Sequence, residues 1–164
     1  TNDRRQRQMC IRDRNNSIIR LTLSFDVIAH QRNHIELYGT EGSMIVPDPN
    51  MFGGSVYVCK KLGSPWQEFR THKMPLGKIN IRSQSSRANE SPTNANYRGV
   101  GLAEMAYCIE NKKRHRCNGE VSVHVLDLIQ STMYSARTNK PKKINTTCKS
   151  PKLFSLKEIK KILK

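Results

Sequence analysis

The sequence has few aromatic residues and no long apolar run, and each shortage excludes a class of protein. Aromatic residues make up 6% of the 164 positions, and none alternates with basic residues as a base-stacking platform requires. No apolar run approaches the ~18 residues of a membrane-spanning helix, and no charged-then-apolar leader opens the chain. We therefore expect no membrane insertion and a cytoplasmic location.

Cysteine pairs with metal-binding or redox spacing are also missing. The five cysteines are odd in number and form no CxxC pair, so a disulfide framework is not expected and reduced thiols fit the cytoplasm. Two histidine pairings, His30 with His34 and His115 with Cys117, come nearest to ligand spacing. Each has too few companions for a four-ligand zinc site. We expect no metal centre.

Acidic residues are scarce as well, which leaves a large excess of positive charge. The chain has 29 Lys and Arg against 13 Asp and Glu, a net charge of +16. This excess of positive charge favours a nucleic acid or an anionic membrane surface as the binding partner. Most of the excess lies in residues 1–14, which carry +3, and residues 138–164, which carry +8. A solvated tail predicts weak association that vanishes with salt, so we expect no specific nucleic-acid partner.

The first fourteen residues show neither a helical nor a strand period. Residues 9–14, MCIRDR, resemble the translation of a transposon end used in sequencing libraries. A genuine basic arm is the alternative interpretation. We expect residues 1–14 to be a non-native or disordered leader, with native sequence from about Asn15. Residues 15–147 then form one α+β domain, and residues 148–164 form a basic C-terminal extension with a short helix.

Period-two alternation predicts an antiparallel sheet in the first half of the chain. In residues 17–27, Ile19, Leu21 and Leu23 alternate with polar residues, as in a half-buried strand. A hairpin is predicted over residues 34–46, because a Gly at each end of residues 39–42 permits the turn. Further strands are predicted at residues 56–59 and 66–69. The sum is a mainly antiparallel sheet of about five to six strands.

Helical periodicity follows in the second half, after a long polar loop predicted for residues 77–96. One apolar stripe facing the sheet is predicted from four residues at i, i+3, i+4 and i+7: Leu102, Met105, Ala106 and Ile109. A second helix is capped by Asn118, with an inner side of Val121, Val125, Leu128, Ile129, Thr132 and Ala136. A short C-terminal helix opens with a capping box of Ser155 and Glu158. The fold class is α+β, with two long helices on one sheet face.

Two segments together resemble a known family. Residues 34–54, HIELYGTEGSMIVPDPNMFGG, and the helical region 98–144 resemble the C-terminal domain of the Gfo/Idh/MocA oxidoreductases. The resemblance implies an N-terminally truncated, substrate-binding and oligomerisation portion of an NAD(P)-dependent sugar or polyol oxidoreductase. It also implies a missing N-terminal Rossmann domain, a homo-oligomer formed through the sheet and a sugar-like substrate.

The family's catalytic and cofactor-binding residues cannot be transferred to this chain. Gly99 and Gly101 half-match a GxGxxG fingerprint, but Glu104 stands at the third glycine and no strand precedes the turn. Lys140-Pro141 resembles the family's Glu-Lys-Pro motif, with Asn139 in place of the Glu. We expect NAD or NADP to bind only in the full-length parent. We therefore expect no catalytic residue and no bound cofactor in this chain.

Asp26 and His30, at the end of the long predicted strand, are the candidate site residues, at a substrate rim. The alternative is that Asp26 simply occupies the polar face of its strand. Two other functions remain open for the whole chain. One is a standalone basic nucleic-acid-binding module that uses residues 138–164, and the other is a scaffold or oligomerisation domain that has genuinely lost a catalytic half.

Overall fold

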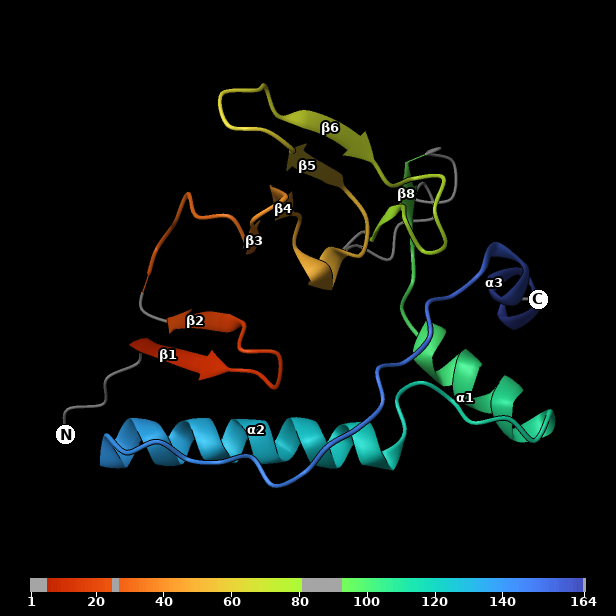
Figure 1. Ribbon diagram of the computed structural model, residues 1–164. Coiled ribbons are helices and arrows are strands. Elements are labelled where there is room, and N and C mark those ends of the chain that lie inside the picture. The colour runs from red at the N-terminus through yellow and green to blue at the C-terminus, as the bar shows by residue number, and fades with distance from the viewer. Residues whose placement is uncertain (1–5, 25–26, 81–92, 164) are drawn as a thin grey trace. The chain divides into compact units, whose positions relative to one another are not determined.

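The computed structural model describes residues 6–24, 27–80 and 93–163 (Figure 1). Helices and strands are both present, as the α+β prediction requires, and the strands of the two main sheets pair antiparallel. The chain divides into two compact units. Unit 1 comprises Thr1–Gln31 with Arg116–Pro151, and unit 2 comprises Arg32–His115 with Lys152–Lys164. No helix in the described part of the chain is long and apolar enough to cross a lipid bilayer.

Unit 1 begins with a two-stranded hairpin. β1 (Gln6–Arg12) pairs antiparallel with β2 (Ile18–Ser24), and the turn is closed by Asp13, whose Oδ1 accepts from the backbone N–H of Ser17 at 2.7 Å. The absence of a strand period in residues 1–14 was therefore misleading for residues 6–12. Met9 and Ile11 lie opposite Leu21 and Ile19, so the apolar match becomes visible only with the partner strand in place.

The predicted long strand is shorter than expected at its C-terminal end. β2 ends at Ser24, while the alternation was expected to continue to Val27. Phe25 and Asp26 lie outside the described residues. Ile19 and Leu23 remain 50% and 46% exposed, so the apolar face of this hairpin is only partly covered.

The long helix of unit 1, α2 (Gly119–Thr138), lies against β1. The predicted cap is confirmed, because Asn118 Oδ1 accepts from the backbone N–H of Glu120 at 3.1 Å and of Val121 at 3.3 Å. The predicted inner side is only partly correct. Val121, Leu128, Thr132 and Ala136 are half-buried, but Val125 and Ile129 are exposed.

Unit 2 is built around an antiparallel four-stranded sheet. Its strands follow the chain order: β3 (Ile35–Gly39), β4 (Gly42–Val46), β5 (Ser55–Cys59) and β6 (Gln67–Arg70). The predicted hairpin is confirmed, with Gly39 paired to Gly42 across a two-residue loop. After β4 the chain enters the short 3-10 helix η1 (Pro49–Met51), where Asp48 Oδ1 accepts from the N–H of Asn50 at 2.9 Å.

Beyond β6 two very short strands pair in parallel. β7 (Ile79–Asn80) and β8 (Asn94–Ala95) lie at the two ends of the predicted polar loop. Residues 81–92, which make up most of that loop, lie outside the described part of the chain. Tyr97 fixes the return of the chain, because its N–H donates to Asn80 Oδ1 at 2.8 Å and its ring lies 5.0 Å from that of Phe52.

Two helices complete unit 2, and they pack on each other. α1 (Val100–Glu110) lies against α3 (Leu156–Ile162), where the buried apolar side chains are Cys108, Ile159 and Ile162. The predicted capping box of α3 is confirmed, since Ser155 Oγ accepts from the N–H of Glu158 while Glu158 accepts from the N–H of Ser155.

The predicted apolar stripe of α1 does not form its buried side. Leu102 and Ile109 are 71% and 69% exposed, whereas Glu104 and Cys108 are buried. The reason is the neighbour of the helix. The helical periodicity of the sequence identifies an apolar face, but it does not identify the element on which that face packs. In unit 2, α1 packs against α3.

Close backbone packing around Gly77 gives a testable prediction. A Cβ on Gly77 would collide with the carbonyl oxygen of Thr71. Gly77→Ala should therefore lower the free energy of unfolding of unit 2 by about 1–3 kcal/mol. Gly101→Ala, inside α1 with open space around it, should raise it by about 0.5–1 kcal/mol. Urea-denaturation midpoints measure both effects, and equal shifts in one direction would contradict this packing.

Candidate functional site

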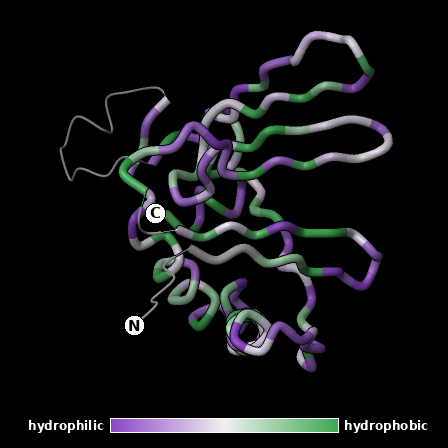
Figure 2. Tube along the Cα trace, turned by 90° about the vertical axis from the view of Figure 1, so that its left-hand side faces the viewer, coloured by the Kyte–Doolittle hydropathy of each residue, from purple (hydrophilic) through white to green (hydrophobic). Residues whose placement is uncertain are grey.

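The pairing register of the four-stranded sheet gives it two chemically different faces. Directly paired residues share a face and neighbours along a strand alternate, so the register assigns each side chain. The apolar face carries Ile35, Leu37, Met44, Val46, Val56, Val58 and Phe69, with the polar Gln67 at its edge opposite Val58. The polar face carries Glu36, Tyr38, Ser55, Tyr57, Glu68 and Arg70 around Ile45. Figure 2 shows apolar and polar positions following each other along the chain trace.

A hydrogen-bonded carboxylate marks one edge of the polar face. Ser55 Oγ donates to Glu68 Oε1 at 2.5 Å, and Arg70 Nε lies 3.6 Å from the same oxygen. The hydroxyl bond, followed by the positive charge of Arg70, holds the pKa of Glu68 below its usual value. Glu68 is therefore an ionised acceptor at neutral pH.

Two tyrosines and a second carboxylate occupy the rest of the polar face. Glu36, Tyr57 and Glu68 lie in one cross-strand row together with Ile45. Tyr38 donates to Glu36, and this bond to a carboxylate raises the pKa of the Tyr38 phenol. Tyr38 is 74% exposed and Tyr57 39%. Tyrosine rings with a polar tip, next to carboxylate acceptors, suit a polyhydroxylated molecule that has both apolar and hydroxyl edges.

Of the two sequence-predicted site residues, the structure describes only His30. Asp26 is outside the described residues, and His30 is exposed in the connection between β2 and β3, which places it in unit 1. None of the polar-face residues was predicted as a candidate. The signal was present in the alternation of Glu36 and Tyr38 with Ile35 and Leu37, but its meaning needed the partners across the sheet.

The half-matched GxGxxG stretch from Gly99 to Glu104 does not fit the dinucleotide fingerprint. Gly99 is the left-handed N-cap of α1, with a φ of 82°, and Gly101 lies inside the helix. The position that should hold a third glycine is Glu104, a carboxylate that is 4% exposed. A buried acidic side chain at that place opposes the close approach of a pyrophosphate. Across the described ranges no group of three His, Cys, Asp or Glu could hold a metal ion.

Unit 1 contains a second ordered polar cluster, centred on Asp127 of α2. Its Oδ2 accepts from the backbone N–H groups of Asn145 and Thr146, both at 3.0 Å, and from Thr146 Oγ1 at 2.9 Å. Its Oδ1 accepts from Ser131 Oγ at 3.2 Å. The bonds from Thr146 lead the causes that lower the pKa of Asp127. The carboxylate thus ties the chain after α2 back onto the helix.

The same cluster fixes the tautomer of His124. Thr146 Oγ1 has one proton, which it donates to Asp127, so it accepts at its 2.9 Å contact with His124 Nδ1. The neutral imidazole therefore carries its proton on Nδ1. His124 is thus a hydrogen-bonded, half-buried histidine of the Asp127 cluster.

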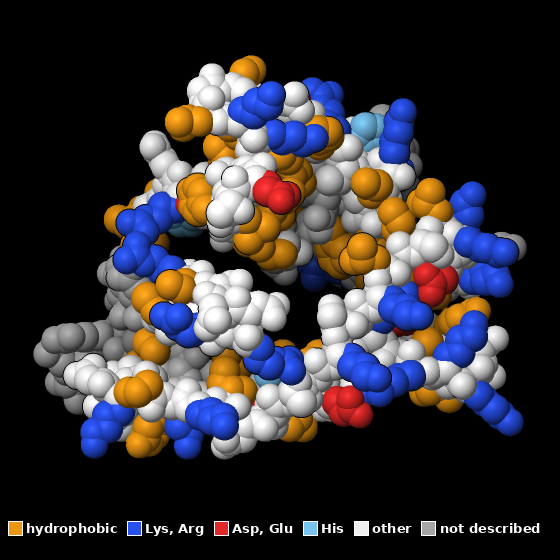
Figure 3. All heavy atoms as spheres, viewed as in Figure 1, with side chains coloured by type: hydrophobic (Ala, Val, Ile, Leu, Met, Phe, Trp, Pro, Cys, Tyr) orange, Lys and Arg blue, Asp and Glu red, His pale blue; other side chains and the backbone are white. Residues whose placement is uncertain are grey.

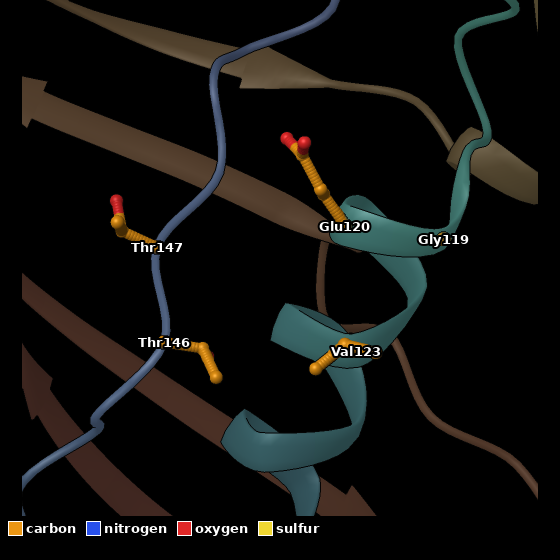
Figure 4. A pocket seen from close by; sticks show the side chains of 5 residues that line it. All are labelled: Gly119, Glu120, Val123, Thr146 and Thr147. Atoms are coloured by element: carbon orange, nitrogen blue, oxygen red, sulfur yellow. The ribbon is translucent and has the colours of Figure 1, made fainter.

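An open hollow of about 370 Å³ lies between the start of α2 and the residues after the Asp127 anchor. Its lining residues are Gly119, Glu120, Val123, Thr146 and Thr147. Figure 4 shows Thr146 and Val123 pointing toward one another, while Thr147 points away from the helix. The hollow is wide open, so its shape alone offers little for recognition.

No protein-family model, curated protein or solved structure matches the chain. The function therefore rests on the residues and their geometry.

The hydrogen bond from Ser55 predicts the behaviour of Glu68. Ser55→Ala should raise the pKa of the Glu68 carboxyl, because the donor that favours the ionised form is lost. Carbon-detected NMR titration of the Glu68 side chain measures this pKa. Ser43→Ala, a serine of the neighbouring β4, is the matched control and should leave it unchanged. An unaltered titration of Glu68 in the Ser55 variant would contradict the assignment.

The Asp127 anchor predicts loss of local stability in acid. Its pKa is lowered on folding, so its contribution is present above the unfolded pKa of about 4 and is lost as pH falls through the folded pKa. Amide-exchange protection factors of Asn145 and Thr146 should drop over that acid range. In Asp127→Asn protection should be low at every pH, whereas the control Glu110→Gln should behave like the parent chain. Protection that is independent of Asp127 would refute the anchor.

Proposed function

We propose that this chain is the substrate-binding and oligomerisation portion of an NAD(P)-dependent sugar or polyol oxidoreductase of the Gfo/Idh/MocA type. The two-faced register of the β3–β6 sheet is the observation that carries the proposal. One face supplies tyrosine and carboxylate groups to a polyol, and the other supplies an apolar surface for a second subunit. The nucleotide-binding domain and the proton-transfer residues belong to a preceding part of the enzyme.

The apolar face is the stronger of the two supports. Five of its seven apolar side chains are half-buried, and Leu37 and Phe69 are 53% and 49% exposed. Burial of such a patch is favourable by about 25 cal/mol per Å² of apolar area. A surface of this kind on a stable protein is normally covered by another part or another copy of it.

A finer arrangement of the fold remains a prediction. The sequence predicts a single sheet of five to six strands with two long helices packed on one face. In that arrangement the helices, and not a second subunit, would cover the apolar face. We favour the second subunit because α1, the longer helix of unit 2, lies against α3. A cytoplasmic enzyme with NAD or NADP in its full-length form completes the proposal.

The alternatives predict different behaviour. A standalone basic module would bind nucleic acid tightly and selectively at moderate salt, and a scaffold that has lost its catalytic half would have a true start codon close upstream. The proposal instead expects the DNA before Asn15 to encode a Rossmann domain with a GxGxxG fingerprint and a Glu-Lys-Pro motif. It also expects the purified chain alone to oxidise no sugar, with either nicotinamide cofactor.

Two adjacent residues of β3 test the roles of the two faces. Leu37→Lys places a charge on the apolar face and should dissociate the oligomer, since an unpaired ammonium cannot be buried there. Tyr38→Lys, on the polar face, should leave the oligomer intact. Sedimentation velocity measures the assembly, and circular dichroism shows whether each variant is folded. Dissociation by Tyr38→Lys alone would reverse the assignment, and unfolding by Leu37→Lys would favour cover by helices.

A further inference from the structure

A row of cations begins in the last turn of α2 and continues beyond the helix, and it has no acidic residue among it. We call residues 137–149 the basic segment; its positive residues are Arg137, Lys140, Lys142, Lys143 and Lys149. All five side chains are exposed, and none forms an ion pair with a carboxylate in the described part of the chain. Figure 3 shows Lys and Arg side chains spread over the visible surface, with several of them near α2.

The basic segment is held at two points, Asn139 and Asn145–Thr146, which flank Lys140, Lys142 and Lys143. Asn139 caps the C-terminus of α2, and its left-handed backbone lets its N–H donate to Ser135 O at 2.9 Å. Six residues later the Asp127 carboxylate takes the N–H groups of Asn145 and Thr146. The residues between these two points therefore lose little conformational freedom on binding a partner, which is the advantage of a preorganised site.

One lysine of the row is positioned by an aromatic ring. Lys142 Nζ lies 5.3 Å from the ring centroid of Tyr134, within the range of a cation–π interaction. The Tyr134 side chain is 46% exposed, so a ring and a cation stand together at the surface. Single-stranded nucleic acids are bound by this combination, a cation for the phosphate and a ring for a base.

The chemistry of the row selects among anionic partners. Lysine ammonium groups are compact point charges that suit phosphates. A phosphodiester chain carries one negative charge on each nucleotide, so several successive phosphates can each contact one cation of the basic segment. A membrane surface would also attract the lysines, but interfacial binding needs exposed large apolar side chains. Ile144, the one large apolar residue of the segment, is half-buried.

We propose that the basic segment binds the phosphodiester backbone of single-stranded nucleic acid without sequence preference. This binding is separate from the polyol-binding face of unit 2. The sequence alone predicted weak binding by a solvated basic tail. The backbone that carries the exposed Lys140, Lys142 and Lys143 is instead fixed on unit 1.

The test is fluorescence anisotropy with an oligouridylate of about 16 nucleotides, titrated at several salt concentrations. With one phosphate for each of the five cations, the slope of log affinity against log salt should be about −3.5, and in Lys140→Gln/Lys142→Gln/Lys143→Gln about −1.4. The matched control, Lys157→Gln/Lys160→Gln/Lys161→Gln, removes three charges from α3 in unit 2 and should keep the parent slope. Equal losses in both triple variants would overturn the proposal.

A fourth variant separates placement from charge. Asp127→Ala raises the net charge from +16 to +17 by removing one negative charge, yet it releases the anchor of the basic segment. Our account expects weaker binding by several-fold, while simple charge attraction expects tighter binding. Circular dichroism establishes that this variant is folded, and if it is not, the two triple variants decide alone.

Vesicles with phosphatidylserine are the competing probe, and preferential loss of vesicle binding in the first triple variant, with oligouridylate binding unchanged, would contradict the proposal.

Discussion

The pairing register of β3 through β6 is the constraint on which the functional reading depends. A shift of one residue in any of these strands would exchange its side chains between the faces and mix apolar with charged groups. The register is held by the Gly39–Gly42 hairpin at one connection. At the other end Thr71 joins the last strand to the preceding loop, because its Oγ1 accepts from the N–H of Gly54 at 2.9 Å. The separation of the two faces is thus built into the turns.

Unit 1 has a different organisation, in which the Asp127 carboxylate fixes the residues that follow α2. Asp127 gathers two backbone N–H groups and two hydroxyl groups around its two oxygens, so the residues after α2 are fixed although they form no regular element. Such bonds to an ionised acceptor are stronger than neutral ones. The fixed segment is also the most basic part of unit 1, which links its local stability to its proposed contact with a polyanion.

Local signals in the sequence were sufficient for turns and caps. The β3–β4 hairpin, the Asn118 cap and the Ser155–Glu158 capping box each depend on residues within a few positions of one another. Features that depend on distant partners were not accessible in this way. β1 became recognisable only opposite β2, and the buried side of α1 was decided by α3, more than forty residues along the chain.

The candidate site shows the same limit. Glu36 and Glu68 are 32 positions apart in the sequence and share one row of the polar face, and Asp127 meets Thr146 across 19 positions. Alternation predicted that strands exist, but not which strands are neighbours. Asp26 and His30 were chosen from one strand alone, where no cross-strand partner could be considered.

The central claim, that the polar face of the β3–β6 sheet receives a polyol, is tested most directly by NMR. Titration of the isotope-labelled chain with inositol at millimolar concentration should shift the resonances of Glu36, Tyr38, Tyr57 and Glu68. The resonances of Leu37, Val56 and Val58, which alternate with them on the apolar face, should not move. Shifts on the apolar residues alone, or none in the sheet at saturating inositol, would contradict the account.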